Sequence, residues 1–229
     1  MSVSSTADAT SSSGQDPLAR LAFVGNVHRL LALGYARLDA PKYCEVDENR
    51  LTQVLVQELR AATQDPSAPE AVVSFTVHEK QKQNDGVLEG NSRLELDICF
   101  ERTGRGPHPA FKVEAKPLGP AHPVGSHLGQ KSCYLGQDGL GAFISAEYAS
   151  EQGDAGMLGY VQSKSVEEWV ASLADKLGGS PGAFSVSPDG TWQAHVFPDG
   201  PSFTYRTRHN RAGGFAAITI FHTLLDFRA

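Results

Sequence analysis

The stretch FKVEAKPLG, residues 111–119, has the pattern of a β-strand but carries an acid and a base. Its apolar residues fall on alternate positions, as they do on a strand with one buried face. Residues two apart on a strand project from the same face, so Glu114 and Lys116 are expected to stand side by side. Pro117 has no N–H group to donate and is therefore expected to end the hydrogen-bonded ladder.

The preceding stretch, RLELDICFE at residues 93–101, alternates more regularly, and one of its faces is acidic. The segment 102–109, RTGRGPHP, is a short Gly- and Pro-containing loop, which predicts an antiparallel hairpin. Cross-strand neighbours on one face have Cβ atoms about 4.5–5.5 Å apart. A register that sets Asp97 near Glu114 would gather two carboxylates and the Lys116 ammonium in one small volume.

Two crowded carboxylates repel each other, and the pKa of one rises unless a cation neutralises the pair. Oxygen ligands of this kind suit Mg²⁺, which uses one or two protein carboxylates alongside water and phosphate oxygens. Such an ion lowers the pKa of a bound water and offsets charge in a phosphoryl-transfer transition state. Lys116 could hold or polarise the attacking water. The competing interpretation is an exposed ion pair without function.

With its spacing, RLELDICFE followed by FKVEAKPL resembles the bipartite signature of the PD-(D/E)xK, or restriction-endonuclease-like, nuclease superfamily. The resemblance implies that Asp97 and Glu114 ligate Mg²⁺ (or Mn²⁺) and that Lys116 is the catalytic lysine. Leu96 stands where the family often has a proline. The family's first helix often adds a glutamate, for which Glu48 is the first candidate and Glu58 the second; an acid in the first helical turn also simply complements the helix dipole.

The order of elements is the second point of resemblance. Residues 46–63 predict an amphipathic helix capped by Asp47, and residues 71–79, 93–101 and 110–116 predict three strands. The segment 126–151 predicts a helix, 155–162 a strand, and 165–177 a helix capped by Ser165, with Gly178 just past its end. The last fifty residues predict further strands. The expected fold is α/β, with a mixed central β-sheet flanked by helices in αβββαβ order and extra C-terminal strands.

Three regions divide the chain of 229 residues. Residues 1–16 predict a disordered Ser/Thr-rich leader, 17–44 an N-terminal helix or helical hairpin broken near Gly25, and 45–229 the nuclease-like domain. Three widely spaced cysteines suggest no disulfide framework, which favours the cytoplasm. No apolar run approaches the roughly 20 residues of a membrane span.

A net charge of −6 means that a polyanion must be met by a local basic patch. The candidate is YRTRHNR, 205–211, which supplies Arg206, Arg208, His209 and Arg211 for phosphate contact; a solvated hairpin edge is the equal alternative. Lys131, at the start of the helix after the motif, is a further candidate.

YLGQDGLGAFISAEYA, AGMLGYV, YRTRHNR and IFHTLLDF are similar to stretches of small nuclease-fold proteins of bacterial defence against foreign DNA. The sequence therefore predicts a metal-dependent endonuclease, a hydrolase of phosphodiester bonds in antiviral defence, with DNA favoured over RNA. No base-reading element is identified, so control by a second protein subunit or by homodimerisation is expected. The alternative is a non-catalytic subunit that keeps this fold and docks a partner in a defence complex.

Overall fold

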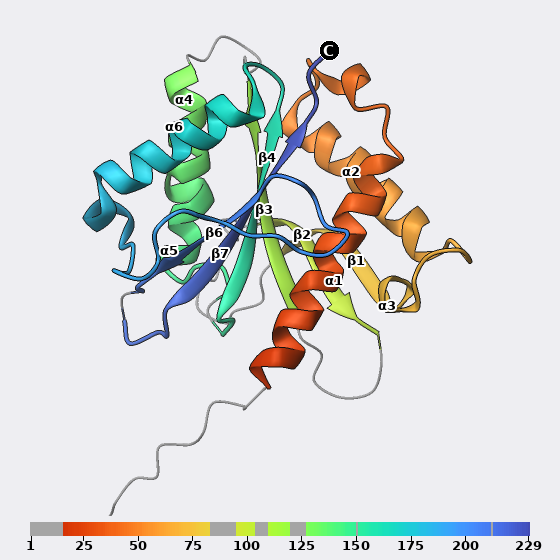
Figure 1. Cartoon of the computed structure of the whole chain (residues 1–229), viewed down its shortest axis with the longest axis horizontal. Helices are drawn as coiled ribbons and strands as arrows, with labels where there is room; N and C mark the ends of the chain where they lie inside the picture. Colours follow the sequence, from red (N-terminus) through yellow and green to blue (C-terminus); the bar gives the residue numbers. More distant parts are fainter. Residues whose placement is uncertain (1–15, 83–94, 104–109, 120–126, 150, 212) are drawn as a thin grey trace, which may run out of the picture.

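A computed structural model describes residues 16–82, 95–103, 110–119, 127–149, 151–211 and 213–229 of the chain (Figure 1). The predicted leader, apart from Asp16, lies outside these residues, as do Leu94 and residue 126. Asp16 belongs to the first helix, because its carboxylate accepts the N–H of Leu18 at 3.0 Å and caps the helix.

A mixed β-sheet of seven strands forms the middle of the molecule, in the order β1-β2-β3-β4-β7-β6-β5. The strands are β1 Phe75–Lys82, β2 Glu95–Arg102, β3 Ala110–Leu118, β4 Asp154–Val161, β5 Gln193–Ala194, β6 Thr204–His209 and β7 Ile218–Asp226. β1, β2 and β3 are antiparallel neighbours, β3, β4 and β7 are parallel, and β7, β6 and β5 are again antiparallel. The sheet is therefore parallel only at its centre.

Helices cover both faces of this sheet, so the chain has the expected α/β architecture (Figure 1). One face packs against α1 Pro17–Ala36, the 3₁₀ turn η1 Ala40–Tyr43, α2 Glu48–Thr63 and α3 Glu70–Val73. The other packs against α4 His127–Leu135, the π-helix η2 Gln137–Gly141, α5 Ala142–Ile144 and α6 Val166–Gly179, which is followed by the 3₁₀ turn η3 Pro181–Phe184. No helix in the described part of the chain is long and apolar enough to cross a bilayer.

The two best-signalled helices form as their sequences predict. Asp47 caps α2 by accepting the N–H of Arg50, and the predicted apolar stripe of α2 is buried. Ser165 caps α6 in a capping box with Glu168. The end of α6 differs, since the helix continues through Gly178 and Gly179 before Ser180 caps it.

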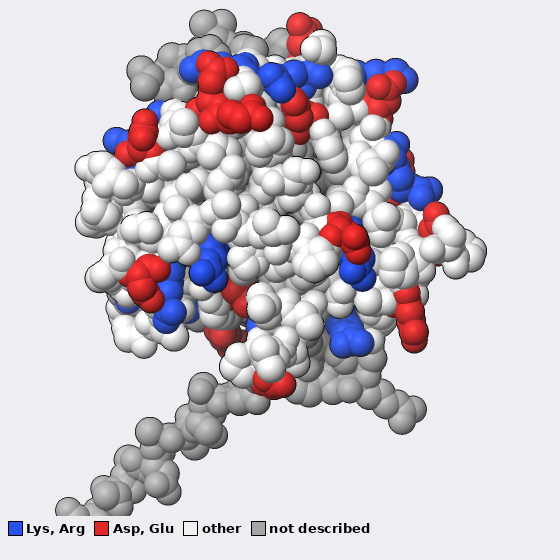
Figure 2. All heavy atoms as spheres, viewed as in Figure 1, with Lys and Arg blue, Asp and Glu red and all other residues white. Residues whose placement is uncertain are grey.

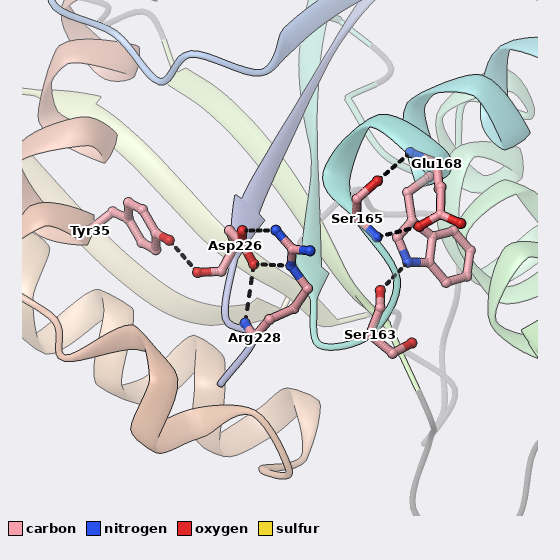
Figure 3. A network of polar contacts seen from close by, with 7 residues as sticks. Tyr35, Ser163, Ser165, Glu168, Asp226 and Arg228 are labelled. Carbon is pink, nitrogen blue, oxygen red and sulfur yellow. Dashed lines mark hydrogen bonds and ion pairs between the residues drawn. The ribbon is translucent and has the colours of Figure 1, made fainter.

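Hydrogen bonds fix the carboxyl ends of the central strands to the surrounding helices (Figure 3). Tyr35 of α1 donates its hydroxyl proton to the main-chain carbonyl of Asp226, at the end of β7. The Asp226 carboxylate in turn accepts from the Arg228 guanidinium. Beside them, the Trp169 indole donates to Ser163 at 2.8 Å and so anchors the start of α6.

The N-terminal region differs from its prediction. α1 is continuous through Gly25, which packs beneath the Phe197 ring. Its inner face shares one core cluster with α2 and the sheet, so residues 17–44 build the same core as the strands that follow. The expected strand over 71–79 begins only at Phe75, because Val72 and Val73 donate to the carbonyl of Pro69 and form α3 instead.

The sequence predicts that Pro117 ends its strand, and this prediction is wrong. β3 runs on beside β4 to Leu118, whose carbonyl accepts the N–H of Gln162. Residues of a strand point their main-chain groups to alternate sides, so Pro117 turns its nitrogen toward β2, where the ladder has already stopped. The segment 126–151 is likewise not one helix: it breaks after Leu135, and Gly139 has non-helical backbone angles.

Candidate metal and catalytic site

The candidate site lies where β2 and β3 separate. Their ladder ends with the pair Ile98 and Val113, and one further step would set Asp97 opposite Glu114, as the hairpin predicts. The Asp97 carboxylate instead accepts the main-chain N–H of Ala115 at 2.8 Å. This hydrogen bond satisfies an amide that β2 no longer pairs and holds the Asp97 side chain between the two strands.

Three carboxylates meet at this point. Glu48 comes from the first turn of α2, Asp97 from β2 and Glu114 from β3, and one oxygen of each lies within 4.8 Å of the others. Lys116 joins them, because its Nζ donates to Glu114 Oε1 at 2.6 Å and to Glu48 Oε1 at 3.1 Å. The four predicted catalytic residues are therefore brought together, and Glu48 is the glutamate that α2 contributes.

Burial makes this cluster electrostatically costly. Glu114 is only 3% exposed, and both Asp97 and Lys116 are buried. Desolvation and then the Asp97 carboxylate raise the pKa of Glu114 to about 8, despite the adjacent ammonium. Burial alone would lower the pKa of Lys116, but Glu114 and Glu48 outweigh it and raise that pKa above its usual value. Lys116 is thus a cation at neutral pH.

One oxygen of the cluster is left over. Glu114 Oε2 is buried and has no hydrogen-bond partner among the residues that the structure describes. A buried carboxylate oxygen without a partner is rare and costs about 1–3 kcal/mol or more. A divalent cation would satisfy this oxygen and oppose the repulsion among the carboxylates, and an all-oxygen donor set suits Mg²⁺ or Mn²⁺. The residues present therefore fit such an ion.

Tyr148 is a buried residue that the sequence patterns did not connect with the site. Its side chain is buried, and desolvation followed by the nearby Glu114 and Asp97 charges raises the pKa of its hydroxyl. No local pattern could have revealed this, because the residue is 34 positions from Glu114 in the chain and follows the irregular η2 and α5 segment. The carboxylates of the site thus influence the hydroxyl of Tyr148.

The predicted basic cluster lies elsewhere. Arg206 pairs with Phe221 of β7, which pairs with Gly156 of β4 and so with Val113 of β3. Paired residues share a face of the sheet, so Arg206 and Arg208 are on the Val113 face, opposite to Glu114. Both are exposed and contact Gln193 and Asp189, respectively. They do not line the carboxylate site of their own chain.

Two other residues of the basic cluster make contacts within the chain, and the burial of His209 contradicts its predicted phosphate contact. His209 is fully buried and is bonded to Thr207 Oγ1 and to the Phe184 carbonyl. The Arg211 guanidinium donates to the main-chain carbonyls of Ala149, Gln152 and Ala216, and it therefore fastens a loop. The alternating pattern of β6 explains His209, since every second side chain points into the core.

The structure also describes the two remaining candidates, Lys131 and Glu58. Lys131 of α4 is partly buried and contacts the Ser172 carbonyl at 3.4 Å. Glu58, the second choice on α2, pairs with Arg37 at the surface and is not part of the carboxylate cluster.

Comparisons of this chain with protein-family models, with curated proteins and with solved structures find no match in any of the three. The geometry of the site is therefore the basis for its interpretation.

Proposed function

We propose that this chain is a metal-dependent nuclease with a restriction-endonuclease-like core that hydrolyses phosphodiester bonds of nucleic acid. The observation that carries the proposal is the buried, unpartnered Oε2 of Glu114 within a cluster of three carboxylates beside a lysine. The order α2, β1, β2, β3, α4, β4, interrupted only by the short α3, η2 and α5, also supports an αβββαβ core of that kind.

Asp97 and Glu114 would hold Mg²⁺ or Mn²⁺, with Glu48 as a third oxygen donor. When bound, the ion supplies an activated water and offsets negative charge on the phosphate. The hydrogen bond from Ala115 N–H orients the Asp97 carboxylate before any ligand arrives. Such preorganisation lowers the cost of binding at the moment of reaction.

Lys116 acts as a hydrogen-bond donor in this proposal. Its raised pKa keeps it protonated, so it is suited to orient a water or a phosphate oxygen and unsuited to act as a general base. Its two contacts to Glu114 and Glu48 set the ammonium beside the carboxylates that bind the ion. A phosphate oxygen or a water could then replace one of these contacts.

The kind of nucleic acid and the biological role are further proposals. DNA is favoured over RNA, and a role in bacterial defence is favoured, on the sequence resemblance alone. Because the described basic residues of β6 lie on the opposite face, we expect phosphate contact at the site to come from the metal and Lys116.

A second candidate is a non-catalytic subunit of the same fold that docks a partner protein. The observation that favours it is the Lys116 ammonium, which already bridges Glu114 and Glu48 and so neutralises part of the cluster without an ion. The unpartnered Glu114 Oε2 is not explained by this candidate.

The test is to offer the purified chain plasmid, linear duplex, single-stranded DNA and RNA in Mg²⁺, Mn²⁺ or EDTA. We expect metal-dependent cleavage, reduced at least about 100-fold in Glu114→Gln and Lys116→Ala. Glu48→Gln should be impaired, whereas the matched control Glu58→Gln, on the same helix but outside the cluster, should cut like the parent. Variants at positions 114 and 116 that cut normally would disprove the site.

Metal binding, measured by calorimetry with Mn²⁺, separates the two candidate functions. A parent chain that binds Mn²⁺ through Glu114 and cuts one of the substrates is the proposed nuclease. A chain that binds no metal, cuts nothing and co-purifies with a second protein is the docking subunit.

A further inference from the structure

The first helix, α1, has two apolar sides. Its inner side, with Val27 and Leu30, is completely buried against the sheet and α2. Its outer side carries Leu18, which is 76% exposed, and Leu21, which is 48% exposed. Arg20 and Arg29 are the helix's only Lys, Arg, Asp or Glu residues. A helix that is apolar all round is normally covered all round, so the outer side of α1 is expected to contact something.

This outer side forms one wall of a groove whose opposite wall is the segment 195–198 between β5 and β6. The groove has a volume of about 460 Å³ and is lined largely by apolar atoms. Val196, 85% exposed, stands at its rim, and Phe197 closes its floor over Gly25. Three of the five exposed large hydrophobic residues in the described parts of the chain, Leu18, Leu21 and Val196, meet here.

The face that carries α1 has few charges near its middle. In Figure 2, which has the viewpoint of Figure 1, Lys, Arg, Asp and Glu side chains gather mainly toward the margins and leave a broad uncharged area over the centre. The lining of the groove contains no carboxylate. An apolar groove flanked by exposed hydrophobic side chains, as found here, commonly marks an interface.

The outer stripe of α1 is complementary to itself. Along the chain, this stripe first presents the large Leu18 and Leu21 and then the small Ala22 and Gly25. If two such helices pack antiparallel about a two-fold axis between positions 21 and 22, each Leu21 lies over the small Ala22 of the partner subunit. Each Leu18 then enters the apolar groove of the partner subunit, where Gly25 is already covered by Phe197. The apolar side chains of each copy thus fill the groove of the other.

Charge agrees with the same register. Arg29 stands at one end of the stripe, and the exposed Asp16 precedes the other. At a rise of about 1.5 Å per residue, the antiparallel pairing brings Arg29 within about 3 Å, along the helix axis, of Asp16 of the partner subunit. Arg29 contacts the exposed Asp199 at 2.8 Å, and an exposed pair of this kind is weak enough to exchange partners.

We propose that this chain forms a two-fold symmetric homodimer through antiparallel packing of the outer faces of α1, with Val196 covered at the rim of the interface. The proposal does not depend on nuclease activity. The residues that line the groove include none of the carboxylate cluster, so the dimer does not use that site.

Sedimentation of the full chain over a range of concentrations tests the interface. We expect a dimer in the parent and a dissociation constant raised at least about 100-fold by Leu21→Glu, which places two charges in the interface. Val73→Glu is the matched control, because Val73 is 40% exposed but lies on α3, outside the groove; it should dimerise like the parent. Thermal unfolding checks that both variants fold. A parent chain that stays monomeric at about 100 μM, or a Leu21→Glu chain that dimerises like the parent, overturns the proposal.

Cross-linking tests the register. Position 22 lies beside the proposed two-fold axis, so Ala22→Cys in a Cys44→Ser, Cys133→Ser background should form a disulfide-linked dimer on mild oxidation; the remaining native cysteine, Cys99, is buried. Val73→Cys in the same background should stay uncross-linked. Absence of the Ala22→Cys dimer, or equal cross-linking at position 73, overturns the antiparallel α1 interface.

Discussion

Two buried polar clusters lie in the same β-sheet, and they solve the problem of burying polar atoms in opposite ways. The carboxylate cluster between β2 and β3 contains Glu114 and Lys116, and one of its oxygens has no partner in the described structure. The second cluster lies on β6 and β7 and is built from neutral side chains. The comparison indicates which cluster is suited to bind a ligand.

The neutral cluster is a continuous chain of hydrogen bonds. Tyr134 contacts His222 Nδ1 at 3.1 Å, His222 Nε2 contacts Thr207 Oγ1 at 2.8 Å, and Thr207 Oγ1 contacts His209 Nε2 at 2.7 Å. His209 Nδ1 ends the chain at the Phe184 carbonyl, 2.8 Å away. A carbonyl only accepts, so His209 Nδ1 carries its proton, and the direction of each preceding bond follows.

In this order, every ring nitrogen and hydroxyl of the two histidines and Thr207 is used. Desolvation lowers the pKa of His209 and, even further, that of His222, so both rings are neutral. A saturated neutral network stabilises one packing arrangement and needs no ligand. The carboxylate cluster is charged and incompletely paired, and this state agrees with the cation binding that we propose for it.

Removing the Lys116 ammonium from the carboxylate cluster should have the largest effect on stability. Lys116→Met leaves Glu48, Asp97 and Glu114 without their ammonium, and we expect the free energy of unfolding in EDTA at pH 8 to fall by about 3–5 kcal/mol. Added Mn²⁺ should restore a large part of this loss. Urea unfolding measures both values.

Lys131→Met is the control for that substitution, because Lys131 makes one weak contact to a carbonyl and faces no carboxylate in the cluster. A Lys116→Met chain as stable as this control would show that the lysine does not neutralise the cluster.

Breaking the neutral chain of hydrogen bonds should lower the free energy of unfolding by somewhat less. Thr207→Val keeps the shape of the side chain but leaves His222 Nε2–H and His209 Nε2 without partners, and we expect a loss of about 2–4 kcal/mol. Unlike the loss in Lys116→Met, this one should be unchanged by Mn²⁺. Thermal and urea unfolding, with exposed Thr76→Val on β1 as control, check the prediction. Rescue by Mn²⁺ would contradict the separation of the two clusters.

The pH dependence of stability should have opposite signs for the two clusters. Per pH unit, this is the smallest of the expected effects. Unfolded histidine binds a proton near pH 6.5, whereas buried His222 and His209 do not, so stability falls below that pH by up to about 1.4 kcal/mol per unit per histidine. Glu114 holds its proton to about pH 8 in the folded chain. Its contribution is therefore full at acidic pH and is lost as the pH rises toward 8, by up to about 1.4 kcal/mol per pH unit in EDTA.

Glu114→Gln isolates this smaller effect. The variant should keep the loss of stability at acidic pH and lack the decline on the alkaline side that the parent shows in EDTA. An unfolding series from pH 5 to pH 9 compares the two chains, and parallel curves would show that Glu114 titrates normally.

The carboxylate pair was predictable because it depends on local rules. Alternation sets Glu114 and Lys116 on one face, and a short loop sets Asp97 on the adjoining strand. The basic cluster was not predictable in the same way. Its side relative to Glu114 depends on the register of four neighbouring strands, and the burial of His209 depends on a partner 25 residues away, Phe184.

The sequence by itself determined the α2 and α6 caps, the alternation of the strands and the presence of an acid–base hairpin, because each rests on contacts between residues close in the chain. Only the tertiary structure decided that Glu48 reaches this hairpin, that Pro117 lies within a strand, and that the apolar outer side of α1 faces solvent. These features depend on how separate elements pack, and packing is a balance of burial and desolvation that no short segment contains.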